Sequence, residues 1–242
     1  MEIRVLGMLE ATEHHRSVLP SAAKPRQVFA LLAVRAGRVV PVPTLFAELW
    51  GDRPPRSAHA TLQTYVKQLR RLMRDAGCDA LGTRFGGYVL DVPSTAVDVA
   101  DYERLVEAGR EAVERADHET AAHHFRAALD LWRGPALVDV PTGDSLSIEV
   151  TRLEDSRLST VECRIDAELR CGRHHVLLSE LAVLTARHPL NENLCAHHMT
   201  ALARSGRQFQ ALEAYRTLRT TLVRELGVEP SSRLRSLHLS LL

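Results

Sequence analysis

R-S-A-H-A-T-L-Q-T-Y-V-K-Q-L-R-R-L-M, residues Arg56–Met73, is the stretch that decides the fold of the first part of the chain. Four apolar residues recur along it at steps of four, three and four: Leu62, Val66, Leu69 and Met73. Three polar residues each follow one of these by two positions: Thr64, Gln68 and Arg71. Because an α-helix turns about 100° per residue, the apolar set shares one side and the polar set points away from it. The stretch predicts a helix over residues 57–75 with one buried and one exposed side.

The same stretch is strongly basic. Residues 53–74 hold six basic side chains and no acidic one: Arg53, Arg56, Lys67, Arg70, Arg71 and Arg74. A lone basic helix is usually an ordinary solvated surface. A helix that combines exposed cations with uncharged hydrogen-bonding side chains such as Gln68 also suits the reading of DNA. The neighbouring segments decide between these two interpretations.

Two shorter helices are predicted upstream. Pro25, at a first-turn position, and the apolar residues that follow it indicate a helix that ends before Gly37. Residues 41–43, with two prolines, lead into a second helix of about two turns that stops at Gly51. Together with the basic helix they would make a three-helix core.

The connection to the basic helix is a proline turn. Pro54 and Pro55 cannot continue a helix, and the Ser57 hydroxyl is expected to accept a hydrogen bond from an early N–H of the next one. A short helix, a proline turn and a longer basic helix have the order of a helix-turn-helix motif.

A hairpin is predicted after the basic helix. The segment L-G-T-R-F-G-G-Y-V-L-D-V, residues 81–92, alternates apolar and polar side chains on both sides of Gly86-Gly87. Such a glycine pair suits the positive φ angles of a tight turn. The hairpin predicts the wing of a winged helix. Arg84 lies beside its tip, where a guanidinium can enter a minor groove, meet a phosphate, or remain an ordinary surface arginine.

From Asp98 onward the pattern is helical almost without a break. The predicted helices cover residues 98–115, 117–132, 145–171, 173–187, 191–205, 207–226 and 230–241. Gly172-Arg173 and Gly206-Arg207 lie 34 residues apart, the period of tetratricopeptide repeats, which stack helix pairs into arrays with partner-binding grooves. A helical bundle that only stabilises its neighbour is the alternative. Asp98 and Asp101 are candidates for capping the first helix, and Trp132 for a core anchor.

Short motifs in a fixed order extend over nearly the whole chain. They are V-L-G at 5–7, R-Q-x-x-A-L-L at 26–32, L-W-G at 49–51, L-Q-T-Y-V-x-Q-L-R at 62–70, G-G-Y-x-L at 86–90, A-L-x-L-W-R-G-P-A-L at 128–137, H-P-L-N-E at 188–192, S-G-R-x-x-x-A-L at 205–212 and R-E-L-G-V-E-P at 224–230. Together they make the chain similar to the Streptomyces antibiotic regulatory proteins, whose first domain resembles the winged helix of OmpR-type response regulators.

The resemblance implies a mainly α protein with a small β component. Residues 1–94 would form a winged helix-turn-helix domain that binds DNA, and residues 95–242 an all-α, tetratricopeptide-like bacterial transcriptional activation domain. The implied function is sequence-specific activation of a biosynthetic gene cluster. Side-by-side protomers or a dimer would bind direct repeats in double-stranded promoter DNA and recruit RNA polymerase and its sigma factor.

On this interpretation the basic helix supplies most of the DNA contacts. The predicted base readers are Thr64, Lys67, Gln68 and Arg71, and an amide such as that of Gln68 can bind adenine with two hydrogen bonds. The predicted phosphate contacts are Arg56, Thr61 and Tyr65, near the helix start, where backbone N–H groups attract anions. Arg84 is the predicted wing contact.

Composition agrees with this division. Residues 1–94 carry 13 lysines and arginines against 8 acidic residues, whereas residues 95–242 carry 18 against 22. A basic first part suits DNA contact, and an acidic second part suits other partners. No apolar run of about 18 residues predicts a membrane span, so we expect a cytoplasmic, nucleoid-associated protein without membrane contact.

Motifs for catalysis or cofactor binding are missing from the sequence. Neither G-x-S-x-G nor G-x-x-x-x-G-K-[ST] occurs, so we expect no enzyme activity, no cofactor and a stand-alone member without the ATPase module of larger relatives. Adjacent histidines point about 100° apart on a helix, and no metal is expected. The four cysteines lack C-x-x-C spacing and are expected to be reduced.

Other functions stay open at this point. A helical-repeat scaffold whose basic part docks on an acidic protein is the main alternative, although such docking requires neither uncharged base readers nor a wing. The sequence excludes neither repression by covering a promoter nor sensing of a small ligand in the repeat groove.

Overall fold

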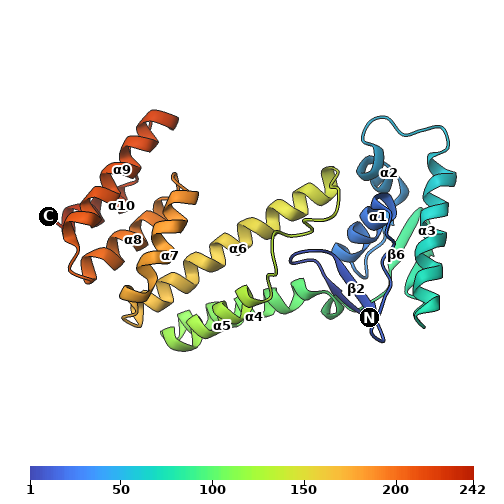
Figure 1. Ribbon diagram of the computed structural model, residues 1–242, viewed down its shortest axis with the longest axis horizontal. Coiled ribbons are helices and arrows are strands. Elements are labelled where there is room, and N and C mark those ends of the chain that lie inside the picture. The colour runs from blue at the N-terminus through green and yellow to red at the C-terminus, as the bar shows by residue number, and fades with distance from the viewer. The chain divides into compact units, whose positions relative to one another are not determined.

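The computed structural model describes residues 1–242 and contains ten α-helices, one 3₁₀ helix and two small antiparallel sheets (Figure 1). The predicted fold class, mainly α with a small β component, is confirmed. The chain divides into two compact units. Unit 1 comprises Met1–Glu107 and Ala127–Leu158, and unit 2 comprises Ala108–Arg126 and Ser159–Leu242.

Each sheet of unit 1 has three strands. The first holds, in chain order, β1 (Glu2–Arg4), β2 (Glu10–Glu13) and β3 (Arg16–Ser17). The second holds β4 (Val40–Pro41), β5 (Leu81–Arg84) and β6 (Gly87–Leu90) in the order β4-β6-β5. β5 and β6 are the predicted hairpin, and β4 pairs with its second strand.

Three helices of unit 1 follow the first sheet along the chain: α1 (Ala23–Val34), α2 (Val42–Trp50) and α3 (Ala58–Asp75), with β4 between α1 and α2. Helix α1 is buried without interruption from Gln27 to Ala33, because α2 and α3 both pack against it. An α-helix buried on most of its circumference needs a continuous apolar run, and V-F-A-L-L-A supplies one. These helices confirm the predicted three-helix core.

Seven α-helices follow the 3₁₀ helix η1 (Ser94–Ala96). They are α4 (Asp98–Glu114), α5 (His118–Asp130), α6 (Asp144–Arg170), α7 (His174–Arg187), α8 (Glu192–Arg204), α9 (Gln208–Leu226) and α10 (Ser232–Ser240). Each begins and ends within two residues of its predicted range. None of the helices combines the length and the apolar character that crossing a bilayer requires.

In unit 2, α7, α8 and α9 pack one against the next. Gly172 before α7 and Gly206 before α9 have φ angles of 77° and 74°, the left-handed region that glycine adopts most readily. Leu181 and Tyr215, at matching positions of the two repeats, are both buried. The 34-residue period therefore corresponds to one pair of packed helices, α7 and α8, as the sequence predicts.

A buried carboxylate joins α2 to the start of α6 within unit 1. Glu48 is 3% exposed, and its two oxygens accept hydrogen bonds from the backbone N–H groups of Gly143, Ser145 and Leu146 at 2.6, 2.9 and 3.1 Å. The Gln27 amide adds a fourth bond at 3.0 Å. Since the first N–H groups of a helix lack partners within it, Glu48 caps α6 from another helix.

The close approach at this cap requires a glycine. A Cβ at Gly143 would lie 2.3 Å from the Glu48 carbonyl oxygen, which is far inside contact distance. The glycine thus lets the backbone before α6 lie against the end of α2, where Glu48 reaches its N–H groups.

Two further carboxylates hold the N-terminal backbone. Asp98 accepts hydrogen bonds from Val5 N and Leu6 N at 2.9 and 3.2 Å, and Asp139 accepts one from Leu9 N at 2.7 Å. The prediction that Asp98 caps its own helix is wrong, because both of its oxygens accept hydrogen bonds from the segment directly after β1. Burial raises the pKa of Asp98, while the two backbone hydrogen bonds oppose that rise.

The Glu48 cap generates a stability prediction. Glu48→Ala leaves three backbone N–H groups without their acceptor, and we expect the free energy of unfolding to fall by about 3 kcal/mol. Urea denaturation of the full chain, followed by circular dichroism, measures this loss.

Glu213→Ala is the matched control. Glu213 forms an exposed ion pair with Arg216 on α9, so its removal should change the free energy of unfolding by less than about 0.5 kcal/mol. Equal urea midpoints for Glu48→Ala and the wild type would contradict the cap.

Unit 2 should lose stability in mild acid. Burial lowers the pKa of His198 below its ordinary value of 6.5, and burial also lowers the pKa of the neighbouring His197. The histidines therefore bind protons more readily in the unfolded chain than in the folded one. Their contribution to the free energy of unfolding is fully present above about pH 6.5, and it is lost as the pH falls through the lowered pKa of the folded state. We expect a lower urea midpoint at pH 5.5 than at pH 7.5.

Replacement by a side chain that does not titrate isolates this effect. The drop in midpoint should be smaller for His198→Gln and unchanged for His15→Gln, since His15 is exposed. A drop of the same size in all three proteins would show that other groups cause it.

Candidate DNA-binding surface

Helix α3 has the two sides that its sequence predicts. The apolar seam is buried, with Leu62, Val66, Leu69 and Met73 all at most 2% exposed. The opposite side is exposed and contains no acidic residue before Asp75: Gln63, Thr64, Lys67, Gln68, Arg71 and Arg74. The burial of the seam against the core fixes which side chains face solvent.

The four predicted base readers all lie on this exposed side. Lys67 and Gln68 form no side-chain hydrogen bond or ion pair, so their polar groups are available. The Thr64 hydroxyl donates to Ala60 O at 2.9 Å and keeps acceptor capacity for a base or phosphate donor. Arg71 lies 3.8 Å from Asp75 with its side chain 82% exposed, a loose pair that an anion can displace.

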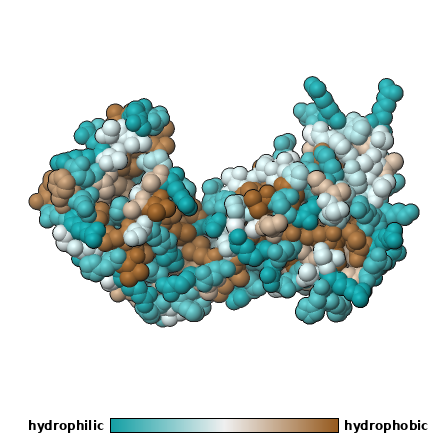
Figure 2. All heavy atoms as spheres, viewed as in Figure 1, coloured by the Kyte–Doolittle hydropathy of each residue, from teal (hydrophilic) through white to brown (hydrophobic).

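The predicted phosphate contacts cluster around the start of α3. Arg56 belongs to a fully exposed segment, residues 51–57, from which hydrophilic side chains project in the space-filling view (Figure 2). Thr61 and Tyr65 are half-buried, and Tyr65 packs against the core. Both side chains are therefore only partly open to a DNA strand.

The predicted side-chain cap at Ser57 is wrong. The Ser57 hydroxyl accepts no hydrogen bond from an N–H of α3 and lies 3.5 Å from the Thr61 hydroxyl instead, because the backbone of Ser57 has left the extended conformation that capping needs. No acidic residue occupies the first turn either. The positive end of the helix is therefore free of any anionic side chain.

The hairpin turn differs in detail from the expected glycine pair. Gly86 has a φ of 78°, but Gly87 is extended and is the first residue of β6, paired with Arg84. A Cβ at Gly87 would lie 2.2 Å from Val40 O on β4. Gly87 is needed for this close approach, and the two turn residues are Phe85 and Gly86.

Arg70 fixes the hairpin to α3, a role that sequence reasoning missed. Its guanidinium donates to Leu81 O at 2.9 Å and to the Thr83 hydroxyl at 2.6 Å, and lies 6.0 Å from the centre of the Tyr88 ring. A guanidinium holds several acceptors in one plane, which fixes both position and angle. The sequence showed Arg70 only as one of six basic residues.

A hollow of about 470 Å³ lies between α3 and the hairpin. It is lined by Gln63, Val66, Lys67, Arg70, Arg74, Thr83 and Tyr88. Three of these are basic and none is acidic, so the hollow carries positive charge and hydroxyl donors. A phosphate backbone strand has the matching chemistry.

Arg84, the predicted wing contact, turns back along the hairpin. Its guanidinium lies 3.4 Å from the Asp91 carboxylate and 3.3 Å from Thr83 O. The side chain is 55% exposed, so this surface pair is weak and exchangeable.

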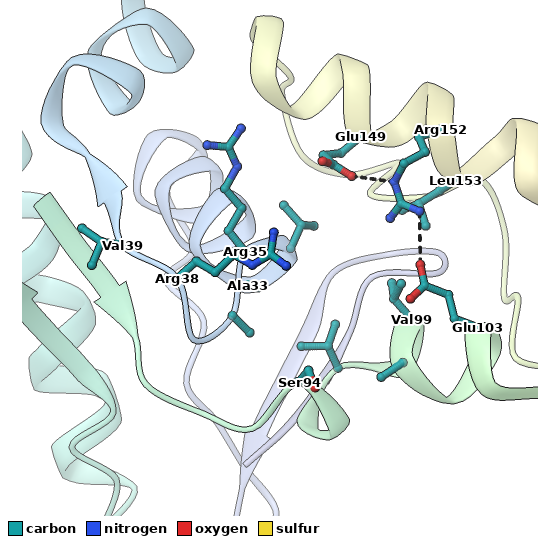
Figure 3. A pocket seen from close by; sticks show the side chains of 14 residues that line it. Ala33, Arg35, Arg38, Val39, Ser94, Val99, Glu103, Glu149, Arg152 and Leu153 are labelled. Atoms are coloured by element: carbon teal, nitrogen blue, oxygen red, sulfur yellow. Dashed lines mark hydrogen bonds and ion pairs between the residues drawn. The ribbon is translucent and has the colours of Figure 1, made fainter.

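A second cavity of unit 1, about 550 Å³, has no residue of α3 in its lining (Figure 3). Arg152 of α6 donates there to Glu149 at 2.9 Å and to Glu103 of α4 at 3.1 Å, which ties the two helices together. Arg35 and Arg38, from the end of α1 and the turn after it, form the opposite wall. The arrangement contains no nucleophile with an adjacent base, and no group of three side chains is placed to hold a metal ion.

Comparisons with known proteins cover the whole chain. The model of the transcriptional regulatory protein C-terminal domain matches residues 17–90, and the model of the bacterial transcriptional activator domain matches residues 97–242. Regulatory protein DnrI of Streptomyces peucetius is 55% identical over 250 residues, covering 100% of this chain and 92% of DnrI. The chain belongs to the Streptomyces antibiotic regulatory protein family.

Two other members extend the comparison. Transcriptional regulator RedD of Streptomyces coelicolor is 35% identical over 100% of this chain and 70% of RedD. The solved structure of Mycobacterium tuberculosis EmbR, in complex with a low affinity phosphopeptide, has a TM-score of 0.93 at 34% identity and covers 99% of this chain. The chain spans 64% of that EmbR chain.

Membership in the Streptomyces antibiotic regulatory protein family establishes the general function of the chain. The chain is a DNA-binding transcriptional activator with a winged helix followed by an all-helical activator domain, and it is not an enzyme. DNA binding belongs to the winged helix. The exposed side of α3, the basic hollow and the hairpin all lie in that domain.

The position of the hairpin should depend on the shape of Arg70 as well as its charge. Arg70→Lys keeps the cation but cannot reach Leu81 O and the Thr83 hydroxyl in one plane, so specific DNA binding should weaken by about 1 kcal/mol. Fluorescence anisotropy with a promoter duplex measures this change. Arg187→Lys, at an exposed position on α7, is the control and should bind as the wild type does. Full affinity in Arg70→Lys would show that the hairpin needs no such anchor.

Proposed function

We propose that α3 enters the major groove of promoter DNA and reads its sequence. Thr64, Lys67, Gln68 and Arg71 contact base edges, and Arg56, Thr61 and Tyr65 contact phosphates near the helix start. The observation that carries this proposal is the exposed side of α3, which combines unpartnered amide and cationic groups with no acidic residue before Asp75. Arg84 adds a wing contact once it exchanges Asp91 for a phosphate.

The activator domain, on this proposal, supplies the contacts that raise transcription. Residues 1–94 bind DNA and residues 95–242 contact RNA polymerase and its sigma factor, with the packed helices α7, α8 and α9 as a tetratricopeptide-like platform. Two protomers bind direct repeats side by side, one helical turn apart, in promoters of a biosynthetic gene cluster. On this proposal the protein is cytoplasmic and associated with the nucleoid.

The test of sequence reading is a binding assay on the intergenic DNA beside the gene, with random duplex as competitor and a salt series. We expect tight, salt-sensitive binding to one fragment and a protected pair of direct repeats. Equal, weak binding to every duplex would favour a scaffold whose basic helix docks on acidic protein.

Gln68 provides the residue-level test. Gln68→Ala should cost about 1–3 kcal/mol on the protected site and leave binding to random duplex unchanged, because the amide contacts a base and carries no charge. Gln210→Ala, at an exposed glutamine on α9, is the matched control and should change neither. Equal losses on both duplexes would assign Gln68 to backbone contact.

Activation is tested separately from binding. A promoter reporter should rise when the protein is present, and purified RNA polymerase holoenzyme should bind the promoter more tightly beside it. A reporter that falls instead would identify a repressor that covers the promoter.

A further inference from the structure

Phe85 is the most exposed large apolar side chain of the protein. Its side chain is fully exposed to solvent. The other phenylalanines near α3 are not: Phe29 lies in the core and Phe46 packs against it. Phe85 and Gly86 are the two residues of the hairpin turn, so Phe85 is the only side chain that the turn presents. Two-residue turns favour asparagine, aspartate or glycine, and a phenylalanine serves no need of the turn itself.

The neighbouring cation does not cover the ring. Arg84 is turned back along β5 toward Asp91 and Thr83 O, away from the turn. The tip of the hairpin is therefore apolar, although its sides are polar and basic. An apolar group held in water beside a DNA-reading helix indicates a dry contact that forms on binding.

The tip is also held firmly in place. Arg70 anchors β5 to α3 through Leu81 O and the Thr83 hydroxyl, and Gly87 is packed against Val40 O of β4. A group positioned before binding loses little conformational freedom when it docks. Phe85 thus projects from a fixed support on both sides of the turn.

The hollow between α3 and the hairpin indicates which part of the DNA Phe85 contacts. The hollow carries three basic residues and no acidic one, so it accommodates the phosphate strand that borders the major groove. Across that single strand lies the minor groove. With α3 on one side of the strand, the hairpin tip is directed to the other side.

We infer that Phe85 enters this minor groove and wedges its ring against a base step, partly unstacking it. The inference rests on the proposed DNA-reading function and extends it to a second, shape-dependent source of specificity. Apolar wedges act best at pyrimidine–purine steps, which unstack most easily, and they bend the duplex toward the major groove. Phe85 would therefore select deformable steps beside the bases that α3 reads.

Two variants of the full chain test the wedge. Phe85→Ala should weaken binding to the protected promoter duplex at least about tenfold, the lower end of the effect of burying a phenylalanine ring. Phe85→Leu, which keeps an apolar wedge, should recover part of the loss. Since Phe85 packs on nothing, both should keep the urea midpoint of the wild type.

A spectroscopic readout separates a wedge from a passive contact. The protected duplex is prepared with 2-aminopurine replacing one adenine at a time, because this base fluoresces when its stacking is lost. Wild-type protein should raise the fluorescence at one step beside the α3 site, and Phe85→Ala should not. Phe209→Ala is the matched control, an exposed phenylalanine on α9 at 72% exposure, and should behave as the wild type.

The outcomes distinguish this inference from the proposed function. Specific binding by the wild type together with unchanged affinity and fluorescence in Phe85→Ala would overturn the wedge alone. Unchanged DNA affinity with a lost reporter response would assign Phe85 to a protein contact and would also overturn it. Failure of the wild type to prefer any duplex would overturn the proposed function itself.

Discussion

The buried carboxylate of Glu48 is the interaction on which the arrangement of unit 1 depends. Its oxygens accept three backbone N–H groups at the start of α6 and one from the Gln27 amide, all at 3.1 Å or less. A carboxylate that is 3% exposed is tolerable only when its lone pairs are filled and the positive end of a helix faces it. Because Glu48 sits on α2, the short helix of the helix-turn-helix motif, the cap links the DNA-binding part directly to the first residues of α6.

Asp98 and Asp139 repeat the same chemistry for the backbone that follows β1. Each accepts backbone N–H groups from the segment Val5–Leu9, and Asp139 also pairs with Arg26 of α1. Three acidic side chains thus satisfy backbone groups that would otherwise be left unpaired in partly buried places. The consequence is that residues 127–158 complete the same compact unit as the winged helix. A truncation at Ser94 would remove Asp98, Asp139 and the capped end of α6 together.

The DNA-binding surface depends on a second constraint, the anchoring of the hairpin by Arg70. The same residue type serves different purposes on adjacent positions of α3: Arg70 is engaged with Leu81 and Thr83, whereas Arg71 is exposed. Planar guanidinium groups suit both tasks, since their fixed set of five N–H donors can hold neutral acceptors such as Leu81 O and can also pair with phosphates. The result is a groove of positive charge with defined walls in place of a uniformly basic surface.

The sequence by itself determined every helix after Asp98 to within two residues, the seam of α3, the hairpin and the family, because periodicity, glycine stops and short motifs are local signals. Tertiary structure alone decided what depends on distant partners. Asp98 accepts hydrogen bonds from Val5 and Leu6 and does not cap its own helix, and Ser57 does not cap α3. Gly87 is required by the close approach of Val40 O. The contact between Glu48 and Gly143 cannot be predicted from their spacing, because 95 residues separate them. Only the folded core brings the carboxylate to N–H groups that have no other acceptor.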